Sequence, residues 1–265
     1  MIETRNVVAR DGVACAVRSA GTDGPALVFV HGVGSTAAIW DAQLRAFAGA
    51  YRCFAVELRG NGVPKPEPSP SEITRAGFAA DVVAVLDAYA IERCTLIGCS
   101  LGGVVAFELW QRDPHRIDAM AIVGSFARYP DARPYADGIA AAVRAAGDME
   151  TFARNRAAKL GLPPERLRET VEQMACKTVP SYLAATEATW TGDYLDLLPG
   201  IVVPALVACG EHDAIAPLAL SEEIAAGIPA SELAVIAGAG HVANADAPVR
   251  FNERLHEFLT RRRGS

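Results

Sequence analysis

Long apolar runs are missing from this sequence of 265 residues. No segment approaches the ~18–20 consecutive apolar residues that a helix needs to cross a bilayer. The first residues include charged side chains (Glu3, Arg5 and Arg10) and no apolar core, a pattern that argues against a secretory signal peptide. We therefore expect a cytoplasmic protein that does not insert into a membrane.

Basic clusters and paired cysteines are also scarce. The net charge is −6, and the only basic run, Arg261–Arg263, stands at the end of the chain, where we interpret it as a solvated tail. A nucleic-acid-binding protein normally shows a basic patch or stripe. None of the six cysteines belongs to a C-x-x-C pair, so zinc and thioredoxin chemistry have no support and buried free thiols are expected. We therefore predict no nucleic-acid partner, no metal and no organic cofactor.

What the sequence does contain is an alternation of short apolar runs and helical patterns. Residues 26–30, Ala-Leu-Val-Phe-Val, are apolar throughout, as in a strand that is buried on both faces of a sheet. Residues 2–9 and 13–19 alternate around Asp11-Gly12, which predicts a β-hairpin. Further strands are predicted at 51–58, 93–99, 117–123, 203–209 and 233–236, and helices at 39–47, 73–89, 101–112, 218–226 and 248–262. This order predicts an α/β fold with a mostly parallel central sheet flanked by helices.

The segment 127–192 interrupts that alternation. It shows only helical patterns, so we predict a helical cap inserted into a core that residues 1–126 and 193–265 form. Residues 126–192 carry nine Lys/Arg and eight Asp/Glu, a net charge of +1, whereas the remainder, with sixteen and twenty-three, carries −7. Such a cap would suit an anionic substrate, although solvated faces of amphipathic helices carry the same kinds of charge. Tyr182 and Trp190 are candidates for lining its substrate pocket.

Residues 98–103 read Gly-Cys-Ser-Leu-Gly-Gly and stand between a predicted strand and a predicted helix. In that context G-x-S-x-G is a nucleophile elbow, a strained turn whose neighbours must be small so that strand and helix can approach. The turn would expose the hydroxyl of Ser100 above the sheet as a nucleophile. It would also place the backbone N–H of Leu101 at a helix start, where donors favour negative charge. Cys99 stands one residue too early, so its side chain is expected to point into the fold.

A serine hydroxyl is a poor nucleophile at neutral pH and needs a base. His241 follows the last predicted strand in a loop with glycines on its approach, which would carry the imidazole over the sheet edge. The base needs an orienting carboxylate. Asp213 follows the strand at 203–209, at the edge where the catalytic groups of such sheets gather. Glu211 and Asp193 are the rival acids, and we predict that Asp213 orients the base.

Acyl chemistry also needs two donors aimed at the negative charge that develops on the carbonyl oxygen. The N–H of Leu101 is one of them. The second is expected from the loop 31–35, His-Gly-Val-Gly-Ser, where glycines permit close approach of the backbone to a ligand. We predict that the N–H of Val33 is this second donor. His31 follows a different strand from His241, and we expect it to organise this loop rather than to act as a base.

These motifs resemble the α/β-hydrolase superfamily over nearly the full length of the chain. The matching parts are His31–Gly34, Glu57–Gly62, Gly98–Gly103, Gly210–Asp213 and Gly240–His241. The serine, the aspartate and the histidine also stand in the family's chain order. The 3-oxoadipate enol-lactonase-like branch is most similar, because of Trp40–Leu44, Asp148–Phe152 and Pro180–Ala185. Glu57 and Asn61 depart from the Asp and His that relatives more often carry, and Leu101 departs from their Met, which leaves the substrate open.

The resemblance implies a serine hydrolase that cleaves a carboxylic ester or lactone of a small molecule through an acyl-enzyme intermediate. Two other interpretations stay open at this point. One is a carbon–carbon bond hydrolase acting on a dienoate, although the Asn usual near the oxyanion loop is absent between His31 and Trp40. The other is a hydrolase-like protein that holds a ligand under its cap with little turnover. Neither the substrate nor the oligomeric state follows from the sequence.

Overall fold

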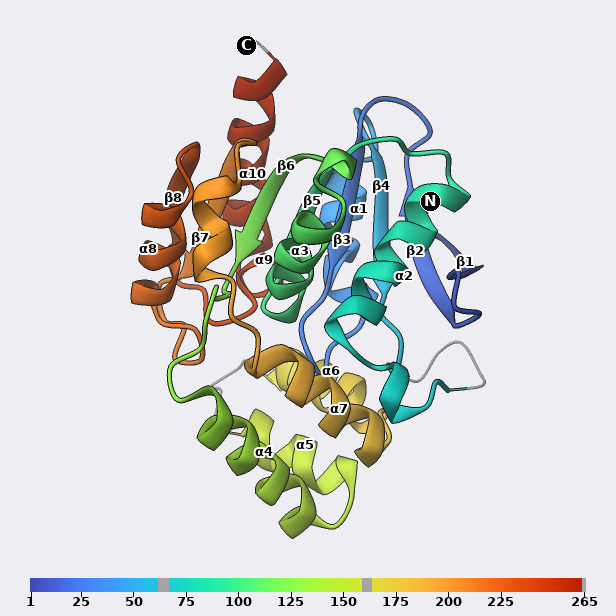
Figure 1. The fold of residues 1–265 in the computed structure, drawn as a ribbon, viewed down its shortest axis with the longest axis vertical. Helices are drawn as coiled ribbons and strands as arrows, with labels where there is room; N and C mark the ends of the chain where they lie inside the picture. Colours follow the sequence, from blue (N-terminus) through green and yellow to red (C-terminus); the bar gives the residue numbers. More distant parts are fainter. Residues whose placement is uncertain (62–66, 159–163, 264–265) are drawn as a thin grey trace.

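The computed structural model describes residues 1–61, 67–158 and 164–263 of the chain. In this described part, eight strands form one sheet in the order β1-β2-β4-β3-β5-β6-β7-β8 (Figure 1). The strands are β1 Glu3–Val8, β2 Ala14–Ala20, β3 Ala26–Val30, β4 Arg52–Glu57, β5 Cys94–Cys99, β6 Ile117–Val123, β7 Ala205–Gly210 and β8 Ser231–Ile236. β1 and β2 form the predicted hairpin, β2 is antiparallel to β4, and all other neighbours are parallel. The predicted α/β fold is confirmed.

The central strands are apolar because both faces of the sheet are covered. All five residues of β3 are buried. Val28 and Val30 belong to one apolar cluster, whereas Leu27 and Phe29 belong to the other. This division follows because successive side chains of a strand point to opposite faces of the sheet. A continuous apolar run is therefore what a strand between two helical layers requires.

The helices of the core supply those two layers. α2 Arg75–Ala88, α3 Leu101–Arg112 and α8 Leu218–Gly227 cover one face, and α1 Asp41–Phe47 and α10 Pro248–Arg263 cover the other (Figure 1). The shorter elements are 3-10 turns at Ala37–Trp40, Pro70–Glu72, Pro114–Arg116 and Leu195–Gly200, and helix α9 Ala243–Asp246. The helix predicted at 39–47 is thus two elements, because the chain is 3-10 up to Trp40 and α-helical only afterwards. Among the described helices, none combines the length and apolarity that a membrane crossing needs.

Between β6 and β7 the described chain forms helices and no strand. They are α4 Ala132–Ala146, α5 Met149–Ala157, α6 Pro164–Ala175 and α7 Val179–Trp190. Figure 1 shows them in green to gold beyond the ends to which the parallel strands point. The N-terminus of α5 is capped by Asp148 and that of α7 by Thr178, whose side chains accept backbone N–H groups. We refer to these four helices as the insertion helices.

The chain leaves the core and returns to it at one place. Arg128 and Asp193 form a β-bridge, and the N–H of Tyr194 donates to the carbonyl of Ala127 at 2.9 Å. The insertion helices lie inside the predicted cap segment, 127–192, of which 159–163 falls outside the described residues. The division into a cap and a core of 1–126 and 193–265 stays a prediction.

Candidate active site

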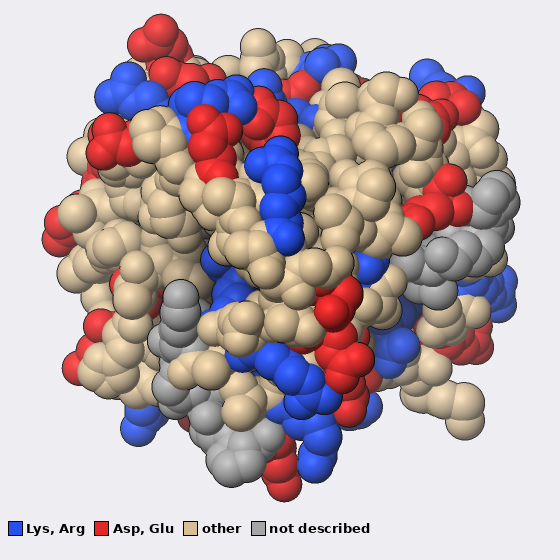
Figure 2. Space-filling view, turned by 90° about the horizontal axis from the view of Figure 1, so that it is seen from below, with Lys and Arg blue, Asp and Glu red and all other residues tan. Residues whose placement is uncertain are grey.

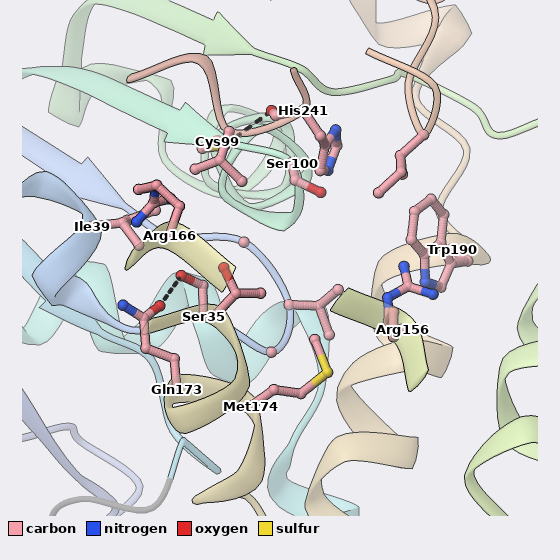
Figure 3. Close-up of a pocket in the computed structure, with 16 residues that line it drawn as sticks. Ser35, Ile39, Cys99, Ser100, Arg156, Arg166, Gln173, Met174, Trp190 and His241 are labelled. Atoms are coloured by element: carbon pink, nitrogen blue, oxygen red, sulfur yellow. Dashed lines mark hydrogen bonds between the residues drawn. The ribbon is translucent and has the colours of Figure 1, made fainter. Parts of the chain in front are cut away.

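Three loops at the carboxyl ends of parallel strands bring the predicted triad residues together. Ser100 stands between β5 and α3, Asp213 follows β7 and His241 follows β8. Ligand and catalytic groups gather at this edge of open α/β sheets because the strand ends leave a crevice there. Figure 3 shows Ser100 and the ring of His241 side by side, and both residues line one pocket.

The elbow around Ser100 depends on glycines because backbone lies where their side chains would be. Ser100 itself has a positive φ, 55°, which is rare for a residue with a Cβ. A Cβ on Gly98 would stand 2.2 Å from the carbonyl of Gly102, and one on Gly102 would stand 2.2 Å from the carbonyl oxygen of Val30. Backbone cannot move aside as a flexible side chain can. The glycines of the motif therefore let β5, α3 and β3 meet at the nucleophile.

Ser125 has a role at the elbow that sequence reasoning missed. Its hydroxyl donates to the carbonyl of Ser100 at 2.7 Å. It also lies so close to α3 that a Cβ on Gly103 would stand 2.4 Å from its Oγ. Residues 124–125, Gly-Ser, follow β6 and include no acid. The structure shows that the small hydroxyl of Ser125 holds the turn at Ser100.

Asp213 is the acid that contacts the base. The Nδ1 atom of His241 lies 3.0 and 2.9 Å from its two carboxylate oxygens. A carboxylate only accepts hydrogen bonds, so Nδ1 carries the proton and Nε2 is left free to accept one. The backbone N–H groups of Ile215 and Ala216 each donate to Asp213 at 2.9 Å and fix the carboxylate.

The rival acids are engaged elsewhere. Glu211 accepts the N–H of Gly238 at 2.8 Å in an exposed position. Asp193 is exposed and lies 3.6 Å from Arg128. Of the acids that the sequence left open, Asp213 is therefore the one that the structure brings to the imidazole of His241.

His31 holds the loop that approaches the nucleophile. This histidine is fully buried, and burial lowers its pKa to about 3. Its Nε2 accepts the N–H of Leu58 at 3.1 Å, and its Nδ1 therefore donates to the carbonyl of Gly32 at 2.8 Å. In a trans peptide the N–H points opposite to the carbonyl. Pinning the Gly32 carbonyl thus turns the N–H of Val33 to the other side, and a Cβ on Gly32 would stand only 3.2 Å from that of Ser100.

Glu57, where relatives more often carry Asp, supports the same loop. Its carboxylate accepts the N–H of Ala37 at 2.7 Å and lies 3.6 Å from Nε2 of His31. Burial raises the pKa of Glu57 to about 7. The Lys177 side chain of the insertion is also buried and donates to the carbonyl of Asn61 at 3.2 Å. Asn61, the other departure in this motif, therefore lies at a contact between the core and the insertion.

The pocket has a volume of about 70 Å³ and two kinds of wall (Figure 3). The loops of the core contribute Gly32, Val33, Gly34, Ser35, Ile39, Cys99, Ser100, Ile215, His241 and Val242. The insertion helices contribute Arg156, Arg166, Thr170, Gln173, Met174 and Trp190. The arginines, Gln173 and Met174 were not predicted. Their only signal is membership of an amphipathic helix, which solvated residues share.

The two aromatic residues predicted to line the pocket, Tyr182 and Trp190, lie in different surroundings. Trp190 lines the pocket, whereas Tyr182 is not among the lining residues. Tyr182 is buried against Phe152, with ring centroids 5.3 Å apart, and one of its ring carbons stands 3.1 Å from a Cβ built on Gly34. In this structure Tyr182 therefore packs beneath the oxyanion loop, because its side of α7 faces the interior.

The cysteines of the chain are mostly buried, and Cys99 lies next to Ser100 at the pocket. Cys99 is buried in the cluster beneath α1 and α10, and burial raises the pKa of its thiol. All six cysteines are free, and only Cys176 escapes the predicted burial. Within the described residues, no group of three or more His, Cys, Asp and Glu could hold a metal ion.

Comparison with known proteins places this site in a family. The model of the Alpha/beta hydrolase family matches residues 27–254, which include the elbow and the loops of Asp213 and His241. The chain belongs to this family. The resemblance inferred from the sequence motifs is thereby confirmed, and the protein is a hydrolase with an α/β-hydrolase fold.

Relatives of this hydrolase match it over most of their length. It is 26% identical over 245 residues to 3-oxoadipate enol-lactonase 2 of Acinetobacter baylyi, with 90% of each chain covered. It is 31% identical over 250 residues to a protein of Variovorax paradoxus whose name proposes a carbamate hydrolase, with 90% of this chain and 93% of that protein covered. The enol-lactonase of Burkholderia xenovorans LB400 has a TM-score of 0.87 to this hydrolase at 25% identity, covering 97% of this chain and 100% of that one. The similarity therefore includes the insertion helices as well as the core.

Proposed function

We propose that this chain is a serine hydrolase that cleaves a carboxylic ester or a lactone through an acyl-enzyme intermediate. One observation carries the proposal. Ser100, in a strained elbow, shares a small pocket with His241, whose Nδ1 is held by the buried carboxylate of Asp213 at 2.9 Å. This arrangement leaves Nε2 free to take the serine proton, which is the requirement for activating a hydroxyl nucleophile.

The reaction would proceed in two halves. Ser100 Oγ attacks the carbonyl carbon while His241 Nε2 takes its proton, and the same nitrogen then returns the proton to the departing alcohol oxygen. Water, deprotonated by His241, attacks the acyl-enzyme and releases the acid with the serine restored. Asp213 keeps the imidazole in the reactive tautomer and stabilises the imidazolium that forms.

Two backbone donors would bind the oxyanion. The N–H of Leu101 is the first amide of α3 and has no acceptor within its own helix. The N–H of Val33 is turned away from the Gly32 carbonyl that His31 binds. Such preorganised donors act where negative charge develops, and each is worth about 10²–10³-fold in rate.

The size of the pocket favours a compact substrate. One water needs roughly 10–15 Å³ of such space, so the volume of about 70 Å³ accommodates about five water-sized groups. The reacting carbonyl and its nearest neighbours fit this space, and we propose that the insertion helices act as the cap that limits it. The names of the two enol-lactonases support a lactone, which is a cyclic ester, and the name that proposes a carbamate hydrolase belongs to the same acyl chemistry.

The test compares wild type with Ser100→Ala on a panel of short esters, lactones and one carbamate. The variant should lose roughly 10⁴–10⁶-fold in kcat, because a triad acts as a unit. A fluorophosphonate should label wild type and leave the variant unlabelled. Intact protein mass locates the label, and a melting curve confirms that the variant is folded.

Three results would overturn the proposal. Labelling or ester cleavage that persists in Ser100→Ala would remove the serine from the mechanism. Absence of both turnover and labelling in wild type would favour a ligand-binding protein, and cleavage of a dienoate alone would favour carbon–carbon bond hydrolysis.

A further inference from the structure

Among the described residues that line the pocket, two carry a positive charge, and they differ in their partners. Arg166, on α6, lies 2.5 Å from the carboxylate of Glu169 and 3.7 Å from that of Asp246. Arg156, near the end of α5, has no ion pair with a carboxylate in the described part of the chain. The charge of Arg166 is therefore compensated within the protein, whereas that of Arg156 is not.

The neighbours of Arg156 cannot neutralise it. The groups that bear on its charge are the hydroxyls of Tyr182, Tyr135 and Tyr129. Burial raises the pKa of Tyr129 and of Tyr182, so both stay neutral at physiological pH. A guanidinium remains protonated in proteins. Arg156 thus presents a full positive charge, partly withdrawn from water, at the wall of the catalytic pocket.

Trp190 adds a second donor at the same wall, beside Arg156, whose side chain is hydrogen-bonded to Tyr135. The Trp190 side chain is 1% exposed, and its indole N–H has no hydrogen-bond acceptor among the described residues. The ring is fixed by Phe126, stacked at 5.1 Å, and by Tyr129 and Tyr135, each at 4.6 Å. Figure 3 shows Trp190 and Arg156 at the same end of the pocket. A buried donor left unsatisfied is costly, so an acceptor supplied by a ligand would be favourable there.

We infer that Arg156, together with the indole N–H of Trp190, binds a carboxylate that the substrate carries in addition to the bond cleaved at Ser100. This inference rests on the proposed function and names its substrate class: half-esters or lactones of small dicarboxylic or hydroxycarboxylic acids. The planar guanidinium matches a carboxylate through two parallel hydrogen bonds. The indole N–H supplies a third donor, and no carboxylate of the protein competes for Arg156 in the described residues.

The experiment uses pairs of substrates in which a terminal carboxylate replaces a terminal methyl group. Monomethyl glutarate is compared with methyl pentanoate for a carboxylate on the acyl side, and 3-acetoxypropanoate with propyl acetate for one on the alcohol side. Wild type should prefer the charged member of one pair. Arg156→Gln should lower kcat/KM for that charged substrate by roughly 10–100-fold, as expected when a hydrogen-bonded charge is lost. The loss of kcat/KM for the neutral partner should be at least ten times smaller.

Two further variants control for charge and packing. Arg154→Gln removes the same charge from the same helix at an exposed position, 67% accessible and paired with Glu150, and should keep the wild-type ratio between the substrates. Arg156→Lys should recover part of the preference, because it restores the charge without the bidentate geometry.

A binding measurement separates this inference from the proposed function. Calorimetry with glutarate on Ser100→Ala, with and without Arg156→Gln, needs no turnover, and the double variant should bind at least tenfold more weakly. Equal losses on charged and neutral esters, or glutarate binding that ignores Arg156, would overturn the carboxylate site. Neutral ester cleavage and fluorophosphonate labelling would still report on Ser100 independently.

Discussion

The two walls of the pocket are built on different principles. On the core side, backbone geometry holds the reactive groups: the φ of Ser100, the glycines of the elbow and the pinned peptide of Gly32. On the insertion side, side chains projecting from helices form the surface, as Arg156 and Trp190 do. Backbone constraints tolerate few residue types, whereas a helix face can be repopulated without changing the helix. In our proposal, the core wall therefore supplies the chemistry and the insertion wall selects the substrate.

Charge separates the two walls as well. The charged groups of the core wall are matched, because His241 is paired with Asp213 and His31 is neutral. The insertion wall holds Arg156, whose guanidinium has no carboxylate partner among the described residues. Figure 2, viewed from below Figure 1, shows acidic and basic side chains interspersed over the outer face, without a field of one sign. The net positive charge of residues 126–192 therefore acts, in our proposal, through one guanidinium inside the pocket rather than through a surface patch.

The largest expected effect lies on the core wall. Asp213→Asn should lower kcat by about 10⁴-fold, because an asparagine amide can donate to Nδ1 of His241 and favour the wrong tautomer. The measurement is steady-state kinetics on the best ester, with a melting curve for each variant. Glu211→Gln is the matched control, since it keeps an acceptor for the N–H of Gly238 and should change kcat little. A large loss in the control with a small loss in Asp213→Asn would reverse the assignment of the acid.

A smaller effect is expected at His31, which supports a loop of the core wall. His31→Gln should lower kcat by roughly 10–100-fold, because a displaced Gly32 carbonyl misdirects the N–H of Val33, a donor worth up to about 10³-fold. KM should change much less, since the donor acts on the transition state. Equal changes in kcat and KM, or loss of fluorophosphonate labelling through unfolding, would point to a packing role alone.

The pH dependence of stability provides the control for His31. Its pKa is about 3 in the folded chain and about 6.5 when unfolded. The unfolded state therefore binds more protons between these values, and stability falls as pH drops from about 6.5 towards 3, by up to about 1.4 kcal/mol per pH unit. Above about pH 6.5 this contribution is complete. His31→Gln lacks it, so the stability difference between the two proteins should narrow as pH falls. A difference that stays constant would contradict a buried neutral histidine.

The smallest expected effect concerns two aromatic residues of the insertion, Trp190, which lines the pocket, and Tyr182, which does not. Trp190→Phe keeps a ring but removes the indole N–H that we propose to bind the carboxylate, and should change the preference for charged esters by about fivefold. Tyr182→Phe removes a hydroxyl outside the pocket lining and should leave the preference within about twofold. The measurement is the ratio of kcat/KM for monomethyl glutarate and methyl pentanoate. A larger effect at Tyr182 than at Trp190 would indicate that the substrate lies on the side of α7 that carries Tyr182.

Much of the core wall could be predicted from the sequence because its constraints are local. The elbow requires small residues at fixed distances from Ser100, and strands of continuous apolar residues mark the edge at which Asp213 and His241 emerge. The hairpin, the strand order along the chain and the helical character of the described parts of 132–190 were likewise visible as periodicities. These features are determined by neighbours within a few residues, and the sequence by itself established them.

Only the tertiary structure decided which helix faces meet the pocket. Tyr182 and Trp190 stand on one helix, but eight residues at about 100° per residue place them roughly 80° apart around its axis, so only one lines the pocket. Arg156 and Arg166 look alike in sequence, yet Arg166 lies near carboxylates of α6 and α9, whereas Arg156 has no carboxylate partner among the described residues. Ser125, which follows β6, donates a hydrogen bond to the carbonyl of Ser100, which follows the neighbouring strand β5. Each outcome depends on groups distant in the chain, and partners that arrive only on folding leave no local pattern.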